Sequence, residues 1–519
     1  MSCLPQSMIS YKKWLWWLIV GSILFRIIIA SFIELNNDEV YYWTYSQHLQ
    51  WNYFDHPPMV GLLIRLTTFN LSLQQYELFV RFGSIISCAA ATFFIYKIGE
   101  TIHSPKTGFI ASVLYNTSIY SSIISGIFIL PDSPQMFFWT MSLFLLAKLL
   151  KGKENKTLWW IFFGLASGLA IMSKIHGVFL WLGLGLYIFS YRRDLLRSYK
   201  PYLAFLICCI IFIPFFTWNI QNDFITYRYH GSRLEGSPFH FQVNYFLREI
   251  SGEIFYNNPL NFILIFLAVI SFFRNKIRDQ FLMASVLIAL PMIGVFVFIS
   301  MFNETLPHWS GPAYVTLLPL TARYIVLQTA RKLRCVRLLR TSVALILFTI
   351  IGGFIVIGYY PGTLSPKKKI VNKGSGDVTL DMYGWKNVAT MIDTALKKDI
   401  SSGRMDKNSV IVCNHWFPAA HIDYYIGQTI GRPVIGLGNM YDLHHFEWLN
   451  AYQLKNKSIT DAWCIVPSNY NCDVKAVYGQ RFSSVDTLGV FTSYRSGAVC
   501  RYFTIYRLKH FIGKIPEVF

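Results

Sequence analysis

The sequence predicts a polytopic α-helical membrane domain, residues 1–360, followed by a soluble α/β domain, residues 361–519. Of the 519 residues, 54% are hydrophobic, 17% are aromatic and 14% are charged, whereas a soluble domain carries about 25% charged residues. Apolar runs of membrane-spanning length recur up to residue 360 and stop there. This composition excludes an ordinary soluble protein.

The first apolar run, Trp14–Ile33, is 20 residues long, which is enough to cross a hydrocarbon core of roughly 30 Å at about 1.5 Å per residue. It is too long for the core of a signal peptide and continues into Glu34 without a small-residue cleavage site, so we expect it to remain as a membrane anchor. Eleven or more spans are predicted in all. They run approximately over residues 14–33, 79–97, 107–126, 134–150, 158–173, 177–190, 202–218, 259–273, 281–301, 310–327 and 341–360.

Basic residues distinguish the two sides of the predicted membrane domain. Lys and Arg cluster at every second connection, whereas the loop 34–78 contains a single basic residue, Arg65, beside five acidic ones. The positive-inside rule places the N-terminus and the basic connections in the cytoplasm. An odd number of spans then puts the loops 34–78 and 219–258 and the soluble domain outside. The net charge of +20 is therefore mainly a topology signal, and we expect no nucleic-acid partner.

Short apolar runs predict the elements of the soluble domain. Strands are expected at Asn408–Cys413, Pro433–Gly438 and Ala462–Val466, a helix at Phe417–Gly427, and a β-rich closing segment around Cys500–Arg507. Four cysteines of this domain could form two disulfides in an oxidising compartment or remain buried free thiols, and their spacing fits no zinc motif. They are Cys413, Cys464, Cys472 and Cys500.

The adjacent carboxylates Asp38 and Glu39 follow the first predicted span, at the outer membrane face. The aromatic stretch 40–51 suits a helix along the interface, which the turn Asp55-His56-Pro57-Pro58 would end. Asp38 could be a general base that takes a proton from an acceptor hydroxyl or amine, since a base needs a fixed position within hydrogen-bond reach. It could equally be the N-cap of this helix, with Glu39 solvated in the first turn.

Other polar residues at the outer connections each allow two interpretations. Asp132 could act in chemistry or cap the helix that follows it. Lys174 could bind a lipid phosphate or extend its side chain to the interface. Arg228 and Arg233 suit bidentate pairing with a phosphate. His308 could donate a hydrogen bond to a phosphate, bind a metal or be an interface residue.

Taken in order, these motifs resemble those of bacterial members of the protein O-mannosyltransferase and aminoarabinose transferase superfamily. The members of this superfamily, families 39 and 83, are membrane-embedded glycosyltransferases of the C fold. The resemblance covers roughly residues 14–327 and lies in the order of the motifs and in their placement on one face. The motifs are Asp38-Glu39, Tyr53-Phe54-Asp55-His56-Pro57-Pro58, Pro131-Asp132, Ser173-Lys174, Trp218-Asn219 with Arg233, and Pro307-His308-Trp309 with Ala313-Tyr314.

The resemblance implies an inverting transfer of a sugar from a polyprenyl phosphate to a lipid such as lipid A, a polysaccharide or a protein, at the periplasmic face of a bacterial inner membrane. It implies that Asp38 is the base, assisted by Glu39, and that Asp132 is a second carboxylate that places donor or acceptor. The implied contacts to the donor phosphate are Lys174, Arg228, Arg233 and His308. The implied substrate-binding residues are Tyr41, Tyr42, Asp55, His56, Trp218, Asn219, Trp309 and Tyr314.

No metal ligands are assigned, because a polyprenyl phosphate already leaves well, but a divalent cation stays a possible cofactor. The chain departs from its relatives at Asp55-His56, where they usually carry a lysine or an acidic–lysine pair. The identity of the sugar therefore stays open. His56 could hold a metal or a donor group, or be a packed turn histidine.

A transporter or flippase of a lipid-linked saccharide is the alternative from another class. It predicts ionisable groups near the bilayer midplane and an internal repeat with interrupted helices, whereas most candidates here lie at loop ends and no repeat is visible. A binding scaffold with vestigial motifs would lack Asp38 or Asp132, and both are present. Arg26 lies inside the first span, where an unpaired charge is costly, so we expect it to face the bundle and pair with a carboxylate.

Overall fold

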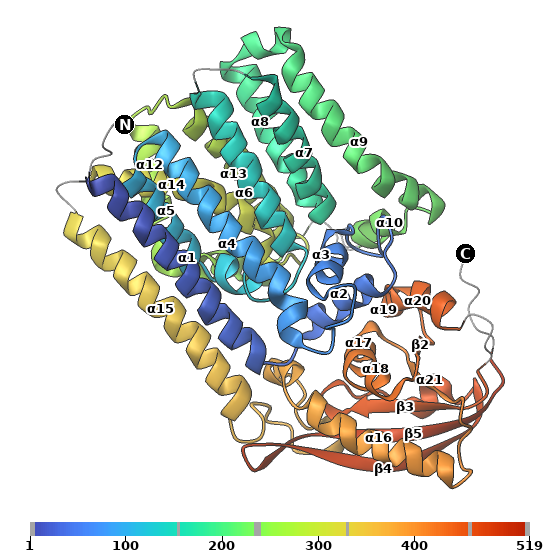
Figure 1. Ribbon diagram of the computed structural model, residues 1–519. Helices are drawn as coiled ribbons and strands as arrows, with labels where there is room; N and C mark the ends of the chain where they lie inside the picture. The colour runs from blue at the N-terminus through green and yellow to red at the C-terminus, as the bar shows by residue number, and fades with distance from the viewer. Residues whose placement is uncertain (1–5, 153–155, 233–239, 329–331, 455–458, 514–519) are drawn as a thin grey trace. The chain divides into compact units, whose positions relative to one another are not determined.

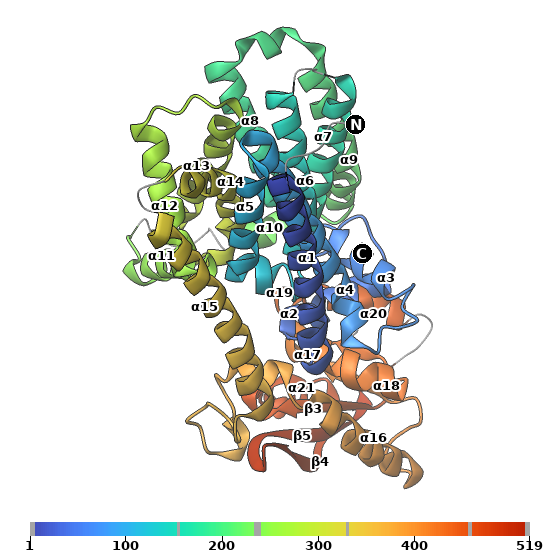
Figure 2. The same cartoon turned by 60° about the vertical axis from the view of Figure 1, so that its left-hand side comes forward.

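The computed structural model describes residues 6–152, 156–232, 240–328, 332–454 and 459–513 (Figures 1 and 2). The chain divides into two compact units. Unit 1 is formed by the segments Met1–Ser31 and Leu49–Ile350, and unit 2 by Phe32–His48 and Ile351–Phe519. The division differs from the predicted boundary at residue 360 because residues 32–48, which follow the first span, pack with the C-terminal part of the chain.

Unit 1 is entirely helical in its described part. Its helices are α1 (Gln6–Phe32), α3 (Met59–Thr67), α4 (Glu77–Ile102), α5 (Pro105–Thr117), α6 (Asp132–Lys151), α7 (Thr157–Ser173), α8 (Val178–Tyr191), α9 (Tyr199–Gln221), α10 (Ile225–Ser232), α11 (Val243–Tyr256), α12 (Pro259–Arg274), α13 (Gln280–Ser300), α14 (Gly311–Leu327) and α15 (Lys332–Tyr359), the last of which continues into unit 2. In both ribbon views α7, α8 and α9 lie side by side (Figures 1 and 2).

Five described helices are long and apolar enough to cross a membrane, and a sixth span results if α11 and α12, which meet at a bend of 96°, are counted as one. The five are Ser10–Phe32, Glu77–Ile102, Tyr199–Gln221, Gln280–Ser300 and Arg334–Tyr359. The chain is thus a multi-pass membrane protein, and the count of eleven spans stays a prediction. Several predicted spans coincide with shorter helices, such as α5 with 13 residues and α8 with 14.

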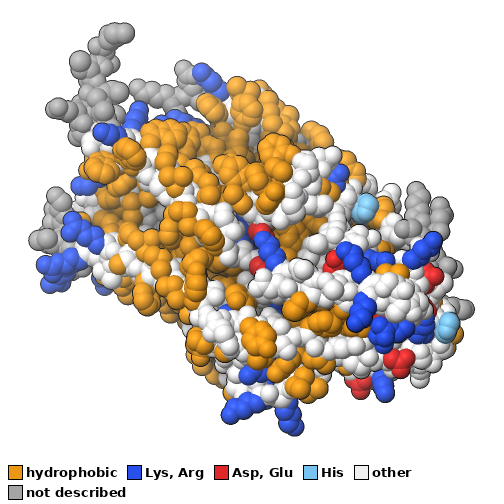
Figure 3. All heavy atoms as spheres, turned by 60° about the horizontal axis from the view of Figure 1, so that its bottom comes forward, with side chains coloured by type: hydrophobic (Ala, Val, Ile, Leu, Met, Phe, Trp, Pro, Cys, Tyr) orange, Lys and Arg blue, Asp and Glu red, His pale blue; other side chains and the backbone are white. Residues whose placement is uncertain are grey.

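The surface agrees with a lipid environment for much of unit 1. On α9, large apolar side chains such as Phe205, Ile210 and Ile213 are more than half exposed, a pattern that costs free energy in water and none in hydrocarbon. Figure 3 shows hydrophobic side chains covering wide areas of one face, while Lys and Arg gather in separate groups.

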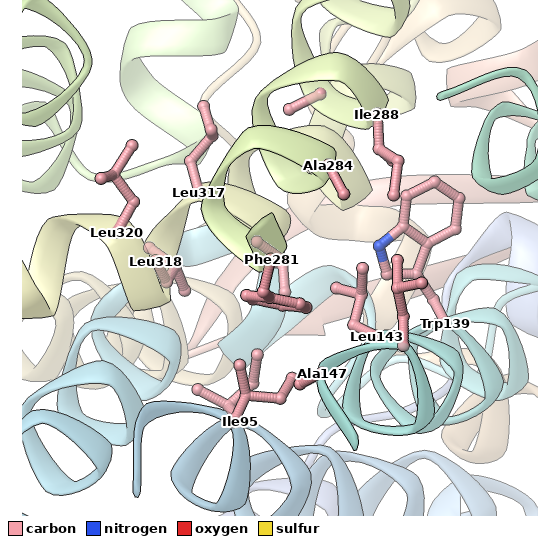
Figure 4. Packing of buried hydrophobic residues seen from close by; sticks show 14 of the residues in the cluster. Ile95, Trp139, Leu143, Ala147, Phe281, Ala284, Ile288, Leu317, Leu318 and Leu320 are labelled. Atoms are coloured by element: carbon pink, nitrogen blue, oxygen red, sulfur yellow. The ribbon is translucent and has the colours of Figure 1, made fainter. Parts of the chain in front are cut away.

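The core of unit 1 includes buried residues of α4, α5, α6, α7, α8, α12, α13 and α14. Figure 4 shows Phe281 at its centre, with Ile95, Ala147 and Leu318 around the ring. The one polar atom of Trp139, its indole nitrogen, donates a hydrogen bond to Thr316 Oγ1 at 2.9 Å. This bond satisfies a buried donor and ties α6 to α14, which both contribute to the site described below.

Unit 2 contains a five-stranded mixed sheet and short helices. Its elements are α2 (Asn37–Gln47), α16 (Trp385–Ser401), β1 (Val410–Cys413), α17 (Trp416–Ile422), α18 (Gln428–Ile430), β2 (Val434–Gly436), α19 (Met440–Leu443), α20 (Phe446–Gln453), β3 (Ala462–Pro467), α21 (Val474–Tyr478), β4 (Phe482–Arg495) and β5 (Ala498–Phe511). The strand order is β2-β1-β3-β5-β4. β1 is parallel to both β2 and β3, whereas β5 is antiparallel to β3 and β4.

The sequence patterns explain these elements. β1, β2 and β3 are buried along their whole length, as continuous apolar runs in a covered parallel sheet are. α16 buries Trp385, Val388, Ala389, Ile392 and Leu396, which is the spacing of one helix face. The predicted strands are therefore confirmed, and the helix predicted after β1 is confirmed as α17, which continues in a further helical turn to Gly427.

The cysteines of unit 2 are free thiols in the structure, so neither predicted disulfide is present among the described residues. Cys413 is buried at the end of β1, and Cys464 is buried within β3. Cys472 is half-buried next to them.

Arg26 does not pair with a carboxylate, so that prediction is wrong for the described residues. Its guanidinium, 4% exposed, instead donates to the carbonyl oxygens of Ser22 and Ser122, to Ser122 Oγ and to Asn116 Oδ1 at 3.2–3.5 Å. Carbonyl and amide oxygens can satisfy the donors of a buried guanidinium without a formal negative charge.

Candidate active site: a buried ion pair and a cavity in unit 1

The centre of the site is an ion pair between Asp132 and Lys174. Lys174 Nζ donates to Asp132 Oδ1 at 3.0 Å and to Oδ2 at 2.8 Å, and both side chains are 3% exposed. Tyr120 Oη donates to Asp132 Oδ1 at 2.9 Å. A buried carboxylate is stable as an anion when a cation and further donors surround it, as they do here.

Helix ends position these groups. Asp132 is the first residue of α6, and Lys174 directly follows α7. Asp132 does not cap α6, since no side-chain cap bond forms there; Ser133 Oγ instead accepts from the Leu130 N–H at 3.3 Å. The capping interpretation of Asp132 and the interpretation of Lys174 as an interface side chain are therefore both wrong.

Gly311, at the start of α14, fixes the position of Tyr120. A Cβ atom at this residue would lie 2.5 Å from two carbons of the Tyr120 ring. Only glycine allows α14 to pass so close to the tyrosine that donates to Asp132.

The loop after α2 is fixed to α10 by three polar contacts. Asn52 Nδ2 donates to Thr226 Oγ1 at 2.8 Å, and this hydroxyl donates to the Tyr53 carbonyl at 3.2 Å. His230 Nε2 lies 2.9 Å from the Asp55 carbonyl. These contacts hold the turn that carries Asp55 and His56 beside α10.

A cavity of about 360 Å³ opens between this turn, the end of α7, α10 and the segment before α14. Its volume lies within the roughly 300–1,000 Å³ of small-molecule sites. Lys174 lies on its wall, together with three histidines, two carboxylates and three aromatic rings. These residues are His56, His176, His230, Asp55, Glu304, Phe215, Tyr227 and Trp309.

His56 on the cavity wall and His308 near it are neutral imidazoles rather than cations. Burial lowers the pKa of His56 to about 3, and burial together with the charge of Lys174 lowers the pKa of His308 to about 4. Both rings are thus uncharged near pH 7. The positive charge of the cavity wall comes from Lys174, and the His56 imidazole can add a directed hydrogen bond to a bound anion.

Several predicted residues do not line the cavity. Arg228 is exposed and donates to the Asp223 carbonyl at 2.6 Å. Its side chain therefore points toward the residues just before α10. His308 lies near Asp132 and Lys174 but is not on the cavity wall. Arg233 lies outside the described residues.

Three further predicted residues form hydrogen bonds inside unit 1. Trp218 Nε1 donates to Gln50 Oε1 at 2.9 Å, and Tyr314 Oη donates to Glu253 Oε2 at 3.0 Å. Asn219 donates to the Phe215 carbonyl at 3.0 Å, and its Oδ1 is buried without a partner among the described residues.

The acidic pair of the first loop belongs to unit 2. α2 is capped by Asn36, whose Oδ1 accepts from the Glu39 N–H at 3.0 Å while Glu39 Oε2 accepts from the Asn36 N–H at 3.0 Å. Asp38 is therefore not the N-cap, and Glu39 is buried rather than solvated. Asp38 itself is exposed in the first turn. Tyr41 and Tyr42 are buried, and the Tyr41 ring lies 5.1 Å from the ring of Trp416.

Sequence reasoning missed Tyr120, His176 and His230 as members of the site. His176 stands two residues after Lys174 and His230 two after Arg228, so polar clustering at the outer connections could have indicated both. Nothing in the pattern around Tyr120 indicated its bond to Asp132, because the residue lies inside a predicted span.

The described residues offer no complete set of protein ligands for a divalent cation. No group of three or more His, Cys, Asp or Glu side chains in that part of the chain is arranged to hold a metal ion. We therefore derive no step through a metal.

Comparisons with known proteins agree with this architecture. The family model described as dolichyl-phosphate-mannose-protein mannosyltransferase matches residues 55–218. The lipid A galacturonosyltransferase RgtD of Rhizobium johnstonii is 24% identical over 303 residues, which cover 57% of this chain and 62% of RgtD. The match thus spans less than two thirds of that relative's length.

Solved structures share the fold. ArnT from Cupriavidus metallidurans in the apo state superposes with a TM-score of 0.65 at 13% identity, covering 96% of this chain and 98% of ArnT. ArnT bound to undecaprenyl phosphate gives a TM-score of 0.63 at 12% identity over the same shares of both chains. The archaeal oligosaccharyltransferase AglB from Archaeoglobus fulgidus gives 0.50 at 12% identity, covering 87% of this chain and 69% of AglB. These likenesses show that the chain shares its fold with ArnT and AglB.

Proposed function

We propose that this chain, a C-fold protein of the protein O-mannosyltransferase and aminoarabinose transferase superfamily, is an inverting glycosyltransferase that uses a polyprenyl-phosphate sugar. The acceptor is a lipid of the lipid A type, with a polysaccharide or a protein as the other candidates. The reaction takes place at the outer face of a bacterial inner membrane, where eleven spans would also place unit 2.

The observation that carries this proposal is the buried Asp132–Lys174 pair, whose lysine lines a cavity together with the neutral imidazole of His56. Asp132 fixes the Lys174 ammonium in place, so the cation needs no reorganisation when a charge develops nearby. Preplaced donors of this kind stabilise a leaving phosphate in the transition state. His56, on the same wall, can supply a hydrogen bond to a phosphate oxygen.

The chemistry balances with these groups. Asp38 takes the proton of an acceptor hydroxyl or amine as that atom attacks the anomeric carbon, which inverts its configuration. The bond from the anomeric carbon to the phosphate oxygen breaks, and the polyprenyl phosphate leaves with the electron pair. Lys174 is the proposed cation for the charge of this leaving group. A positioned base contributes about 10²–10⁴-fold to such a step.

Support for a lipid acceptor comes from RgtD, whose name gives lipid A as its substrate, and support for the donor from ArnT bound to undecaprenyl phosphate. A transporter is not favoured, since the comparisons contain glycosyltransferases and the ionisable groups of the cavity lie at helix ends.

The test is transfer of radiolabel from undecaprenyl-phosphate sugars to a membrane lipid extract by the purified protein. Wild type is compared with Asp38→Asn, Asp132→Asn and the control Asp486→Asn, which makes the same change at an exposed position on β4. We expect label in the lipid fraction with wild type and control, and a loss of about 10²-fold or more with Asp38→Asn.

Equal rates with wild type and Asp38→Asn would remove Asp38 as the base. No transfer with any donor, despite folded protein, would contradict the proposed activity. Donor consumption without transfer, as release of free sugar, would support donor binding in unit 1 and direct attention to the acceptor.

A further inference from the structure

Unit 2 contains a pocket of its own, about 490 Å³ in volume. Its walls come from the ends of β1 and β3, the segments that follow these strands, and the first residue of α2. The volume again lies within the roughly 300–1,000 Å³ of small-molecule sites. None of the catalytic or donor-phosphate candidates lines this pocket.

The pocket lies where the strand order of the sheet reverses. β1 has β2 on one side and β3 on the other, both parallel to it, and Val412 is paired with Ile435 and with Cys464. The connections that leave the carboxyl end of β1 and that of β3 therefore diverge, and a crevice forms between them. Open α/β sheets bind ligands in such crevices.

The lining is polar and aromatic but carries little charge. Among its described residues none is Lys, Arg, Asp or Glu. Amide, imidazole, indole and phenol groups are present instead, in Asn414, His415, Trp416, Tyr470 and Asn471. A phosphate or nucleotide site would need cations, whereas this set offers neutral donors and acceptors together with aromatic surface.

One acceptor atom in the wall has no partner. Asn37 Nδ2 donates to Asp381 Oδ2 at 3.0 Å and to Tyr470 Oη at 3.4 Å, which fixes the orientation of the amide. Asn37 Oδ1 is buried and has no hydrogen-bond partner among the described residues. A buried acceptor without a partner costs free energy that a ligand hydroxyl would recover.

From these observations we propose that the unit 2 pocket is a saccharide-binding site that takes a neutral sugar unit of the acceptor. Hydroxyl groups of a sugar ring would donate to Asn37 Oδ1 and pair with the amide of Asn414, and its apolar face would pack on Trp416 or Tyr470. Asn37 directly precedes Asp38 in α2, so the pocket wall includes the residue next in sequence to the proposed base. The identification of this sugar with the acceptor rests on the proposed function, whereas saccharide binding itself does not.

The first experiment measures binding without transfer. The full-length protein in detergent is titrated with N,N′-diacetylchitobiose, a neutral glucosamine disaccharide, and separately with inorganic phosphate, by saturation-transfer difference NMR. Asn414→Leu removes a half-buried amide of the pocket. Asn408→Leu, which makes the same change at an exposed position before β1, is the matched control. We expect the disaccharide to bind wild type and control alike, and Asn414→Leu to weaken binding about tenfold.

The second experiment measures transfer with the same variants. Asn414→Leu is expected to raise the KM for the acceptor about tenfold while kcat and the KM for the donor stay unchanged. Circular dichroism and thermal unfolding check that the variant folds. If it does not fold, Asn471→Ala, at an exposed position of the same wall, replaces it.

The outcomes separate the two proposals. Transfer by wild type together with no disaccharide binding, or with an unchanged acceptor KM in the pocket variants, overturns the saccharide site and leaves the glycosyltransferase. Disaccharide binding lost in Asn414→Leu, with no transfer from any donor, supports the site and overturns the proposed function. Phosphate that displaces the disaccharide overturns the assignment to a neutral sugar.

Discussion

Each unit buries an aspartate beside a cavity, but the two aspartates have opposite surroundings. In unit 1, Asp132 accepts two bonds from the ammonium of Lys174 and one from Tyr120. In unit 2, Asp381 accepts only from the neutral groups of Asn37 and Tyr470, and its Oδ1 has no partner among the described residues. Burial raises the pKa of Asp381 to about 7.

The difference shows that burial alone does not decide the charge of a carboxylate. A cation in direct contact outweighs the cost of desolvation, whereas neutral donors offset it only in part. The site in unit 1 is thereby suited to a charged ligand, and the pocket in unit 2 to a neutral one. The predictions below test this contrast in order of expected effect.

The largest effect is expected from breaking the ion pair of unit 1. Lys174→Met leaves the Asp132 carboxylate buried without its cation, which should lower the free energy of unfolding by about 3–5 kcal/mol. Thermal unfolding in detergent measures it. The double variant Asp132→Asn with Lys174→Met should recover most of this loss, because it leaves no buried charge.

A surface pair is the control for this prediction. Asp194→Asn breaks the exposed contact between Arg192 and Asp194, which should change stability by less than about 1 kcal/mol. An equal loss in both variants would mean that the Asp132–Lys174 pair is solvated, and the contrast between the units would fail.

A smaller effect is expected from displacing Tyr120, the third group around Asp132. Gly311→Ala places a methyl group against the tyrosine ring, and such overpacking should lower stability by about 1–3 kcal/mol. It should also lower transfer activity, since the ring holds the carboxylate.

Gly294→Ala in α13 is the matched change, because no described atom lies within 4 Å of the added methyl group. It should be neutral or stabilising, since alanine favours a helix interior over glycine by about 1 kcal/mol. Destabilisation of similar size at both positions would show that the effect comes from the helix backbone and not from Tyr120.

The other half of the comparison predicts a pH dependence for unit 2. The folded protein holds a proton on Asp381 up to about pH 7, whereas the unfolded chain releases it near pH 3.8. The contribution of this group to stability is therefore complete below pH 3.8 and is lost as the pH rises to 7, at a slope of at most about 1.4 kcal/mol per pH unit.

Asp381→Asn removes this group, so its stability relative to wild type should rise between pH 4 and pH 7 and level off above. Taking the difference between the two proteins cancels the opposite contribution of His56 and His308, whose lowered pKa values stabilise the fold as the pH rises. A difference that is flat with pH would mean that Asp381 is ionised, as Asp132 is.

The smallest effect is expected from the cap of α2. Asn36→Ala removes one half of the capping box and should cost about 1 kcal/mol. Because α2 starts with Asn37, a donor to Asp381, the variant should also shift the pH dependence of unit 2. Ser104→Ala, at the cap of α5 in unit 1, should cost a similar amount and leave that pH dependence unchanged.

Part of the candidate site could be predicted from the sequence. The positions of Asp132 and Lys174 at predicted outer connections and the family resemblance of His56 and Trp309 single out these four residues. Lys174, His56 and Trp309 line one cavity, and Asp132 is paired with Lys174. Arg228 was selected by the same argument and lies elsewhere, because a loop position restricts which side of the membrane a side chain occupies but not the direction in which it points.

The sequence by itself determined the membrane character of residues 1–360, the strands of unit 2 and the order of the motifs. Hydrophobicity and its period report the local solvent, whether lipid, water or a protein core, and each segment carries that information alone. Tertiary structure alone decided that α2 belongs with unit 2 and that Asp132 meets a lysine 42 residues away. Contacts between distant segments depend on how helices and strands pack, and no single segment encodes its partner.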